Sequence, residues 1–247
     1  NWQIAQYPQG RTGELPGQQL LPETIVAQAK AAGCASIAYT YTEPTVYFEY
    51  AYDTAKLATA AGLRNVFVSN GYTSAEALRL IAPYLDAANI DLKSFSDEFY
   101  RKICGAKLQP VLDSIRRYRD LGIWIEVTTL IIPGYNDSET ELRQIAEFIY
   151  SVGAEIPWHV SAFYPTHKLL DAPRTSAAIL RRARQIGLDV GLRYVYQGNI
   201  PGEGGENSYC HACGELLIER YGFSIEKNRL QNGCCGACGV AFPGVAM

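Results

Sequence analysis

Six short runs of β-branched and aromatic residues, separated by helix-length segments, constrain the fold of this chain more than any other feature of its sequence. Their centres are spaced roughly 24 to 35 residues apart, the length of one strand plus one helix, and they lie at Ile37, Val66, Ile90, Ile125, Val160 and Tyr194. This spacing predicts parallel strands joined by right-handed crossovers. The expected fold class is α/β, either a β/α barrel or a doubly wound sheet.

Signals for helix boundaries lie between these runs. Pro44 is typical of a first helical position, and the segments Thr73–Glu76 and Ser138–Glu141 have the spacing of capping boxes. Glycines after the helical patterns predict helix ends at Gly62, Gly122, Gly153 and Gly187. The helices are therefore expected to form a scaffold around the strands.

A change in composition after Tyr196 divides the chain. Residues 197–205 are rich in glycine and turn-forming residues, which is typical of a linker. We therefore predict two domains, a barrel over residues 1–200 and a small C-terminal module over residues 201–247. With 247 residues and 48% hydrophobic content, the chain is long enough to bury one large core beside such a module.

The charge of the chain argues against two classes of partner. Its formal net charge is −3 and its sequence pI is about 5.7, whereas a nucleic acid or an anionic membrane attracts a concentrated positive field. No apolar run reaches the roughly 20 residues of a membrane-spanning helix, and no signal-peptide pattern precedes the first helix. We expect a cytoplasmic protein that acts on a small molecule or on another protein.

Most of the cysteines gather near the C-terminus. Two Cys-x-x-Cys-Gly motifs contain four of the seven, at positions Cys210, Cys213, Cys235 and Cys238. Four thiolates with this spacing are typical of a tetrahedral metal site, and a small module with few large apolar side chains needs such a crosslink. We predict structural zinc at this site, with iron as the alternative, and interpret Cys234 and His211 as bystanders.

Polar residues follow five of the predicted strands, where the active sites of barrels and open α/β sheets lie. The segments are Thr40–Pro44, Ser69–Gly71, Asp91–Lys93, Pro133–Asp137 and Tyr164–His167. The strand period of two places Asp91 and Lys93 on one face, either in the barrel mouth or as a simple structural ion pair. Glu43 is either a site carboxylate or an acid that the dipole of a following helix favours.

Three further polar residues leave similar alternatives open. Ser69 and Asn70 could form an ordinary N-cap and turn, or they could belong to a binding site. His159 shares a strand face with Ser161, and a histidine within a parallel strand needs a polar partner. It is equally consistent with the site and with the core.

The segments that carry these residues also occur in a fixed order along the chain. They are Asn1–Ile4, Ile37–Pro44, Val66–Gly71, Ile90–Lys93, Ile131–Gly134, Trp158–Ser161, Tyr196–Asn199 and the two Cys-x-x-Cys-Gly motifs. As a set they resemble the radical S-adenosylmethionine (SAM) enzymes of the AmmeMemoRadiSam system, relatives of pyruvate formate-lyase activating enzyme. The resemblance implies an open, partial (β/α)6 TIM-like barrel that binds SAM and a [4Fe-4S] cluster.

The resemblance also implies roles for individual residues. Glu43, with Thr42 beside it, corresponds to the acidic motif that accepts hydrogen bonds from the ammonium group of SAM. Ser69 and Asn70 correspond to a strand end next to SAM, and His159 to a further cofactor-binding position. Asp91 and Lys93 correspond to a catalytic pair facing the methionine carboxylate and the substrate, a role that suits a lysine point charge.

One element of the family pattern is absent from the sequence. The family binds its cluster through a Cys-x3-Cys-x2-Cys loop, and no such motif occurs among the seven cysteines. The only methionine is Met247, and the family loop ordinarily ends just before a segment like the one that opens this chain. We expect the cluster ligands upstream of Asn1, and expect the chain alone to be inactive.

Two hypotheses for function follow. The first is a radical SAM enzyme that takes electrons from a donor, cleaves SAM reductively to a 5′-deoxyadenosyl radical and abstracts hydrogen from a protein or small-molecule substrate. Activation of a glycyl-radical enzyme is one form of this reaction. The second is a metal-binding interaction module on a catalytically inactive barrel. The acidic residues of the C-terminal module, Glu206, Glu215, Glu219 and Glu226, make nucleic acid a poor partner for it.

Overall fold

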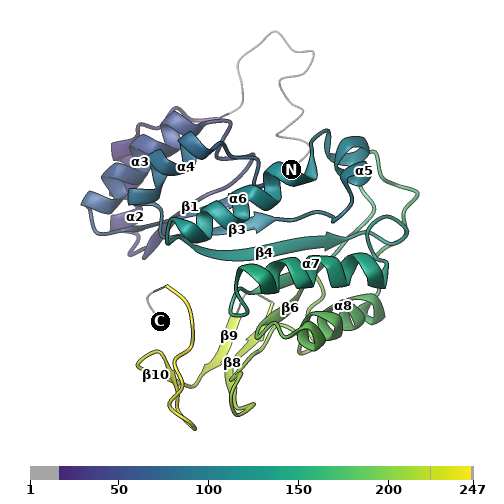
Figure 1. The fold of residues 1–247 in the computed structure, drawn as a ribbon. Coiled ribbons are helices and arrows are strands. Elements are labelled where there is room, and N and C mark those ends of the chain that lie inside the picture. The colour runs from purple at the N-terminus through teal and green to yellow at the C-terminus, as the bar shows by residue number, and fades with distance from the viewer. Residues whose placement is uncertain (1–16, 223, 246–247) are drawn as a thin grey trace. The chain divides into compact units, whose positions relative to one another are not determined.

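The computed structural model describes residues 17–222 and 224–245, and a six-stranded parallel sheet is its main element (Figure 1). The strands are β1 (Ser36–Tyr39), β2 (Arg64–Ser69), β3 (Ala87–Asp91), β4 (Trp124–Ile131), β5 (Trp158–Ala162) and β6 (Val195–Gly198). Their order in the sheet follows the sequence without reversal. Because a doubly wound sheet reverses its order at a switch point, this is a partial TIM-like barrel, and the doubly wound alternative is wrong.

Helices alternate with these strands as the spacing predicts. The longer ones are α2 (Pro22–Ala31), α3 (Phe48–Ala60), α4 (Ala75–Ile81), α6 (Leu108–Asp120), α7 (Glu139–Val152) and α8 (Ala177–Val190). Short helical turns occupy Ala82–Tyr84, α5 (Asp97–Phe99) and the π-helical segment Tyr100–Cys104. None of the helices that the structure describes is long and apolar enough to cross a membrane.

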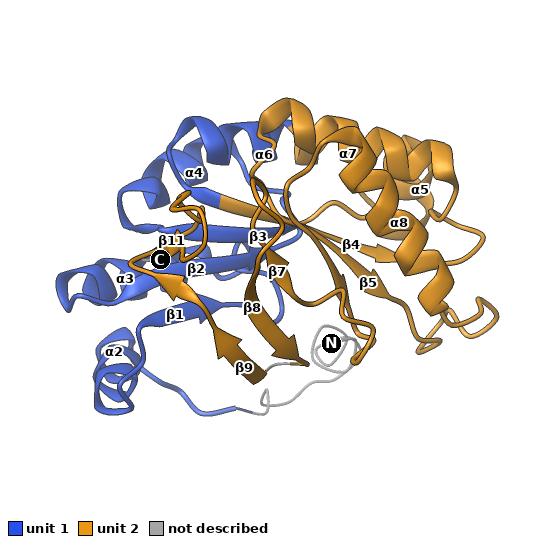
Figure 2. Ribbon diagram, turned by 90° about the horizontal axis from the view of Figure 1, so that it is seen from below, with its two compact units in different colours: residues 1–90, 113–124 blue, residues 91–112, 125–247 orange. Residues whose placement is uncertain are grey.

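The chain divides into two compact units, coloured separately in Figure 2. Residues 1–90 and 113–124 form the first, in which β1 pairs with β2 and β2 with β3. Residues 91–112 and 125–247 form the second, in which β4 pairs with β5 and β5 with β6. The segment Asn1–Ile4, which carries part of the family resemblance, lies outside the described residues.

Alternating burial gives the strands of the second unit two different faces. In β4 one face is fully buried and apolar apart from one threonine: Ile125, Val127, Thr129 and Ile131. The other face of β4 to β6, which we call the open face, stays partly exposed and polar: Glu126, Thr128, His159, Ser161 and Tyr196. A strand face that keeps this many polar side chains is available for binding or chemistry.

Helices α7 and α8 lie side by side in the second unit (Figure 1). Gly187, predicted as a helix end, lies inside α8, which continues to Val190 and ends at Gly191 with φ +110°. A Cβ at Gly187 would meet the Trp158 ring and the Val195 side chain at 2.9 Å. The prediction at Gly187 is wrong because this glycine permits close packing of a helix on the sheet, not a helix end.

Two predicted helix starts also move. Pro44 precedes the helix, because the chain turns through residues 44–47 and α3 begins at Phe48. Ser74, not Thr73, caps α4, accepting from the backbone N–H of Ala77 at 3.1 Å. The capping residue Ser138 of α7 is confirmed, since its hydroxyl accepts from the backbone N–H of Glu141.

Asn65 joins three elements of the first unit through its fully buried side chain. Its Oδ1 accepts from the Tyr39 hydroxyl at 2.9 Å, which connects β2 to β1. Its Nδ2 donates to the carbonyls of Ala55 in α3 at 3.1 Å and of Tyr84 at 2.8 Å. A buried amide with partners on both atoms fixes the relative positions of the elements that it joins.

Replacing Asn65 by Ala is expected to lower the free energy of unfolding by about 2–4 kcal/mol, because the Tyr39 hydroxyl and the Tyr84 carbonyl lose a buried partner. Urea unfolding measures this change. Asn228→Ala is the matched control: Asn228 is exposed and accepts one bond, from the Leu230 N–H at 3.0 Å. Its expected cost is below about 1 kcal/mol, and equal losses in both variants would contradict the role of Asn65.

The C-terminal module is part of the second unit and contains two small antiparallel sheets. One consists of β7 (Ser208–Tyr209), β8 (Leu216–Tyr221) and β9 (Ser224–Asn228), the other of β10 (Leu230–Gln231) and β11 (Cys234–Cys235). Its core is small, with Leu217 and Ile218 buried between Cys210 and Cys235. The domain boundary at residue 200 stays a prediction.

Candidate functional site

Glu43 is a buried carboxylate of the first unit, with 8% of its surface exposed. Its Oε1 accepts from the Ser69 hydroxyl at 2.8 Å and from both the backbone N–H and the hydroxyl of Thr45 at 3.2 and 3.0 Å. Its Oε2 accepts from the backbone N–H of Asn70 at 2.7 Å. The structure thus brings Glu43, Ser69 and Asn70 together, while Thr42 is exposed beside them.

This arrangement leaves acceptor capacity on one oxygen. A carboxylate has about four lone-pair sites, and Oε2 accepts only the Asn70 bond within the part of the chain that the structure describes. The three donors on Oε1 hold the group in one orientation. A further donor, such as the ammonium group of an amino acid, therefore has a fixed partner in Oε2.

Two buried hydroxyls behind Glu43 lack a hydrogen-bond partner among the described residues, those of Thr73 and Tyr118. Burial, together with the negative charge of Glu43, raises the pKa of Tyr118 to about 12, which places the phenol near that carboxylate. Buried polar atoms of this kind are usually satisfied by an ordered water or by a polar ligand group.

Asp91 and Lys93 contact each other in the second unit. The Lys93 Nζ lies 2.7 Å from Asp91 Oδ2, and both side chains are about one-third exposed. The backbone of Lys93 is held on both sides, since its N–H donates to the Tyr100 hydroxyl at 3.0 Å and its carbonyl accepts from Asn136 Nδ2 at 2.6 Å. Each ammonium has three donors, so Lys93 keeps donors beyond the Asp91 bond. The predicted convergence with Glu43 stays a prediction.

His159 lies on the open face, in contact with two residues that the sequence analysis did not select. Its Nε2 lies 2.6 Å from Glu126 Oε2 in the neighbouring strand. Its ring stacks on the Tyr196 ring, with centroids 5.2 Å apart and planes 30° apart. The strand register explains the Tyr196 contact, because His159 pairs with Tyr196. In β4 the residue that pairs with His159 is Thr128, and Glu126 reaches the histidine from two positions earlier on the same face. The available signal was Glu126, the one charged residue in the β4 sequence.

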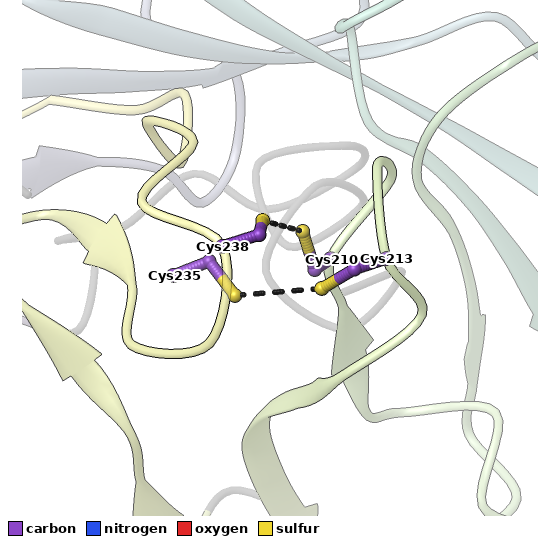
Figure 3. Close-up of side chains that lie close together, drawn as sticks. All are labelled: Cys210, Cys213, Cys235 and Cys238. Atoms are coloured by element: carbon purple, nitrogen blue, oxygen red, sulfur yellow. Dashed lines mark hydrogen bonds between the residues drawn. The ribbon is translucent and has the colours of Figure 1, made fainter.

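The four predicted cysteine ligands converge, and their role as metal ligands stays a prediction. Figure 3 shows them as two facing pairs, with Sγ atoms 3.6 Å apart for Cys210–Cys238 and 3.7 Å apart for Cys213–Cys235. All four sulfurs lie within 4.8 Å of one another. Tetrahedral zinc with bonds near 2.3 Å requires separations of about 3.8 Å, so the cluster has the dimensions of such a site. Cys234 is not part of it.

The surroundings of Cys210 favour its thiolate. Burial raises its pKa, but the backbone amides of Cys213 and Ala212 donate to its sulfur and bring the pKa down to about 7. The turn glycines Gly214 and Gly239 adopt φ +77° and +75° after the two motifs. The neighbouring sulfurs raise the pKa of Cys213 to about 12 and also raise that of Cys238, so metal binding must displace protons from these thiols.

The sequence comparisons agree with this architecture. A model of the radical SAM superfamily matches residues 6–149. An uncharacterised protein of Methanocaldococcus jannaschii is 46% identical over 242 residues, 97% of this chain and 71% of that protein. The isethionate sulfite-lyase activating enzyme of Nitratidesulfovibrio vulgaris is 29% identical over 94 residues, 36% of this chain and 31% of that protein.

A solved structure shows the same fold. A domain of the pyruvate-formate lyase-activating enzyme from Bacteroides vulgatus superposes with a TM-score of 0.56 at 21% identity, covering 67% of this chain and 99% of that one. At this identity the similarity concerns the fold alone. The family model, in contrast, covers more than half of the chain and includes Glu43, Ser69, Asn70, Asp91 and Lys93. The chain belongs to the radical SAM superfamily.

Proposed function

We propose that the protein is a radical SAM enzyme related to those of the AmmeMemoRadiSam system. In the proposed reaction one electron enters SAM, the bond between sulfur and the 5′ carbon breaks, and methionine and a 5′-deoxyadenosyl radical form. The radical takes a hydrogen atom from the substrate and becomes 5′-deoxyadenosine. Membership of the superfamily supports the general reaction, and the activating-enzyme relative supports the oxidoreductase type.

The observation that carries this proposal is the orientation of Glu43. Four donors hold the buried carboxylate, and its Oε2 retains acceptor capacity among the described residues. We assign the SAM ammonium to this oxygen, because a carboxylate with a fixed geometry binds a cation without paying for reorientation. Ser69 and Asn70 act by positioning Glu43, and Thr42 lies at the edge of the same site.

We assign the carboxylate of the methionine part of SAM to Lys93. Asp91 holds the Lys93 ammonium at 2.7 Å, and the Tyr100 and Asn136 contacts fix the backbone from which the side chain extends. His159, held by Glu126, is assigned to a more distant part of SAM on the open face. The proposed role of these residues is to bind and orient SAM, and exclusion of water protects a reactive radical in chemistry of this kind.

A bound [4Fe-4S] cluster supplies the electron in this chemistry, and an external donor must reduce the cluster. None of the seven cysteines of the chain lies in a Cys-x3-Cys-x2-Cys motif. An oxygen-sensitive cluster and unpaired thiols favour a reducing compartment, and we propose the cytoplasm.

A protein is the favoured substrate. The activating-enzyme relative is named for its action on another enzyme, and formation of a glycyl radical is the form of activation that the family resemblance implies. For the C-terminal module we propose structural zinc, because four thiolates within 4.8 Å form a closed site without an open ligand position. Iron is the other outcome of metal analysis.

Formation of 5′-deoxyadenosine tests the proposed function. Under dithionite and without oxygen, the reconstituted full-length protein is expected to make 5′-deoxyadenosine from SAM, as measured by mass spectrometry, and residues 1–247 alone are not. Lys93→Met is expected to lower the rate at least about tenfold, since a hydrogen bond between charged groups contributes about 1.5–3 kcal/mol.

The control for Lys93 is Lys102→Met. Lys102 is an exposed lysine that pairs with Glu98 four residues away on the helix surface, and its replacement is expected to leave the rate unchanged. Equal rates in the two variants would contradict the assignment of Lys93. Absence of 5′-deoxyadenosine from the reconstituted full-length protein would instead favour the metal-binding interaction module on an inactive barrel.

A further inference from the structure

A cavity of about 430 Å³ lies within the second unit, at the junction of α8, β6 and the C-terminal module. Arg184 and Arg193 line it from the barrel side, and Asn207, Tyr209 and His211 from the module side. Its volume lies within the range of roughly 300–1,000 Å³ that is typical of small-molecule sites. The radical SAM reaction proposed above does not use this cavity.

The lining of the cavity is basic although the chain is acidic overall. Its residues include two arginines and no aspartate or glutamate, in a protein with a formal net charge of −3. Most arginine contacts elsewhere involve carboxylates, as at Arg181 and Arg182 in the same helix. Neither Arg184 nor Arg193 forms an ion pair with a described residue. Their charges are therefore available to an anion.

The fold anchors the guanidinium group of Arg184, whereas Arg193 is an exposed side chain. The Arg184 Nε donates to the Val195 carbonyl at 3.1 Å, which anchors one edge of the group and leaves its terminal nitrogens as donors. Arg193 lies close to the Tyr194 hydroxyl. Burial raises the pKa of Tyr194 to about 12, and the positive charge of Arg193 opposes this rise.

Aromatic side chains form another part of the lining. Tyr194, Tyr196 and Tyr209 contribute to the cavity, and the Tyr194 hydroxyl lies 3.1 Å from His211 Nδ1. Two of these rings, those of Tyr194 and Tyr196, are backed by other contacts, with Phe242 at 5.1 Å and with His159 at 5.2 Å between centroids. Tyr194 is only 3% exposed, and the Tyr196 ring already carries His159 and the Arg220 guanidinium, the latter 5.7 Å from its centroid, so Tyr209, which is 40% exposed, is the ring that offers a face for stacking of a planar group.

We propose that this cavity binds a small molecule that carries a phosphate monoester and a planar ring, of the nucleoside monophosphate class. The two arginines recognise the phosphate, because a guanidinium donates two parallel hydrogen bonds to phosphate oxygens. The exposed Tyr209 ring receives the planar base, and Asn207 offers its amide to the polar groups of the ligand. Since Cys210 also lines the cavity, the ligand contacts the metal-binding module directly.

Calorimetric titration of the full-length protein with guanosine monophosphate tests this proposal. This nucleotide is chosen because it lacks the adenine ring of SAM. We expect saturable binding that Arg193→Gln weakens at least about tenfold, as expected for the loss of a charge-assisted pair. Ribose 5-phosphate and inorganic phosphate are expected to bind at least about fivefold more weakly than the nucleotide, since base stacking contributes about 1–3 kcal/mol.

Arg182→Gln is the matched control, because it removes the same charge from an exposed position of the same helix. It is expected to bind the nucleotide like the unaltered protein. Unchanged metal content and far-UV circular dichroism in Arg193→Gln exclude loss of folding, and Arg184→Gln provides a second, independent variant. The proposal is overturned by any of three results: no binding at millimolar nucleotide, phosphate binding as tightly as the nucleotide, or equal affinities of the Arg193 and Arg182 variants.

Discussion

Glu43→Gln is expected to weaken SAM binding to the full-length protein by about 10- to 100-fold, since a hydrogen bond to a charged group contributes about 1.5–3 kcal/mol. The substitution keeps the shape of the side chain but removes its charge. The substitution also replaces one carboxylate oxygen by an NH2 group. The neighbours of the carboxylate, from Ser69, Thr45 and Asn70, are all hydrogen-bond donors, so this NH2 group would face donors only. Equilibrium binding of SAM without oxygen measures the change.

Two further measurements separate the role of Glu43 from a general effect on the protein. The visible spectrum of the iron–sulfur cluster is expected to stay the same, because Glu43 supplies no ligand to it. Glu49→Gln makes the same chemical change at an exposed position of the first turn of α3 and is expected to leave the SAM affinity unaltered. Equal SAM affinities in the two variants would show that Glu43 only stabilises its local turn.

The sheet could be predicted from the sequence because its signal is local and repeated. Each strand has a run of apolar residues with flanking turn signals, and sequential β/α units restrict the possible topologies strongly. The cysteine cluster was predictable for the same reason, since two Cys-x-x-Cys-Gly motifs each fold as a tight turn. The four sulfurs meet as expected.

Packing between distant segments could not be predicted in this way. Gly187 ends a helical pattern in the sequence, yet its lack of a side chain is needed where α8 crosses Trp158 and Val195. Ser74 and Thr73 are adjacent hydroxyl residues, and only the path of the chain decides that Ser74 caps α4 while Thr73 is buried. A capping motif in sequence leaves such a choice open.

In the candidate site, too, residues with a local sequence signal could be selected and residues with long-range contacts could not. Glu43 and the Asp91–Lys93 pair were selected because they lie at strand ends. The 2.7 Å ion pair is the contact that the structural alternative expects, and the role of the pair in a site stays a prediction. Glu126 was missed because the role of a charged residue in the middle of a strand can be inferred only once its contact partner is known. That partner, His159, lies in the next strand. This contact is diagonal, since the residue of β4 in register with His159 is Thr128, and a diagonal contact of this kind depends on the three-dimensional packing of two strands.

Cys213→Ser is expected to reduce the metal content from about one ion per chain to near zero and to unfold the C-terminal module while the barrel stays folded. The module has a core of only a few residues, among them Leu217, Ile218 and Phe242. Its folding energy must therefore come largely from the metal, and zinc contributes about 10–16 kcal/mol in comparable small domains. Elemental analysis and the dispersion of amide NMR signals from β7 to β11 measure the two effects.

Cys234→Ser is a closely matched control, because it makes the same change one position before Cys235, at a cysteine outside the four-sulfur cluster. It is expected to retain the metal and the NMR signals. Loss of the module is also expected to disturb the open face, since Tyr196 donates to or accepts from Ser208 of β7 at 2.7 Å and stacks on His159. Signals of His159 should therefore shift in Cys213→Ser and not in Cys234→Ser. One cooperative transition with unchanged midpoint in both variants would show that the module folds without metal.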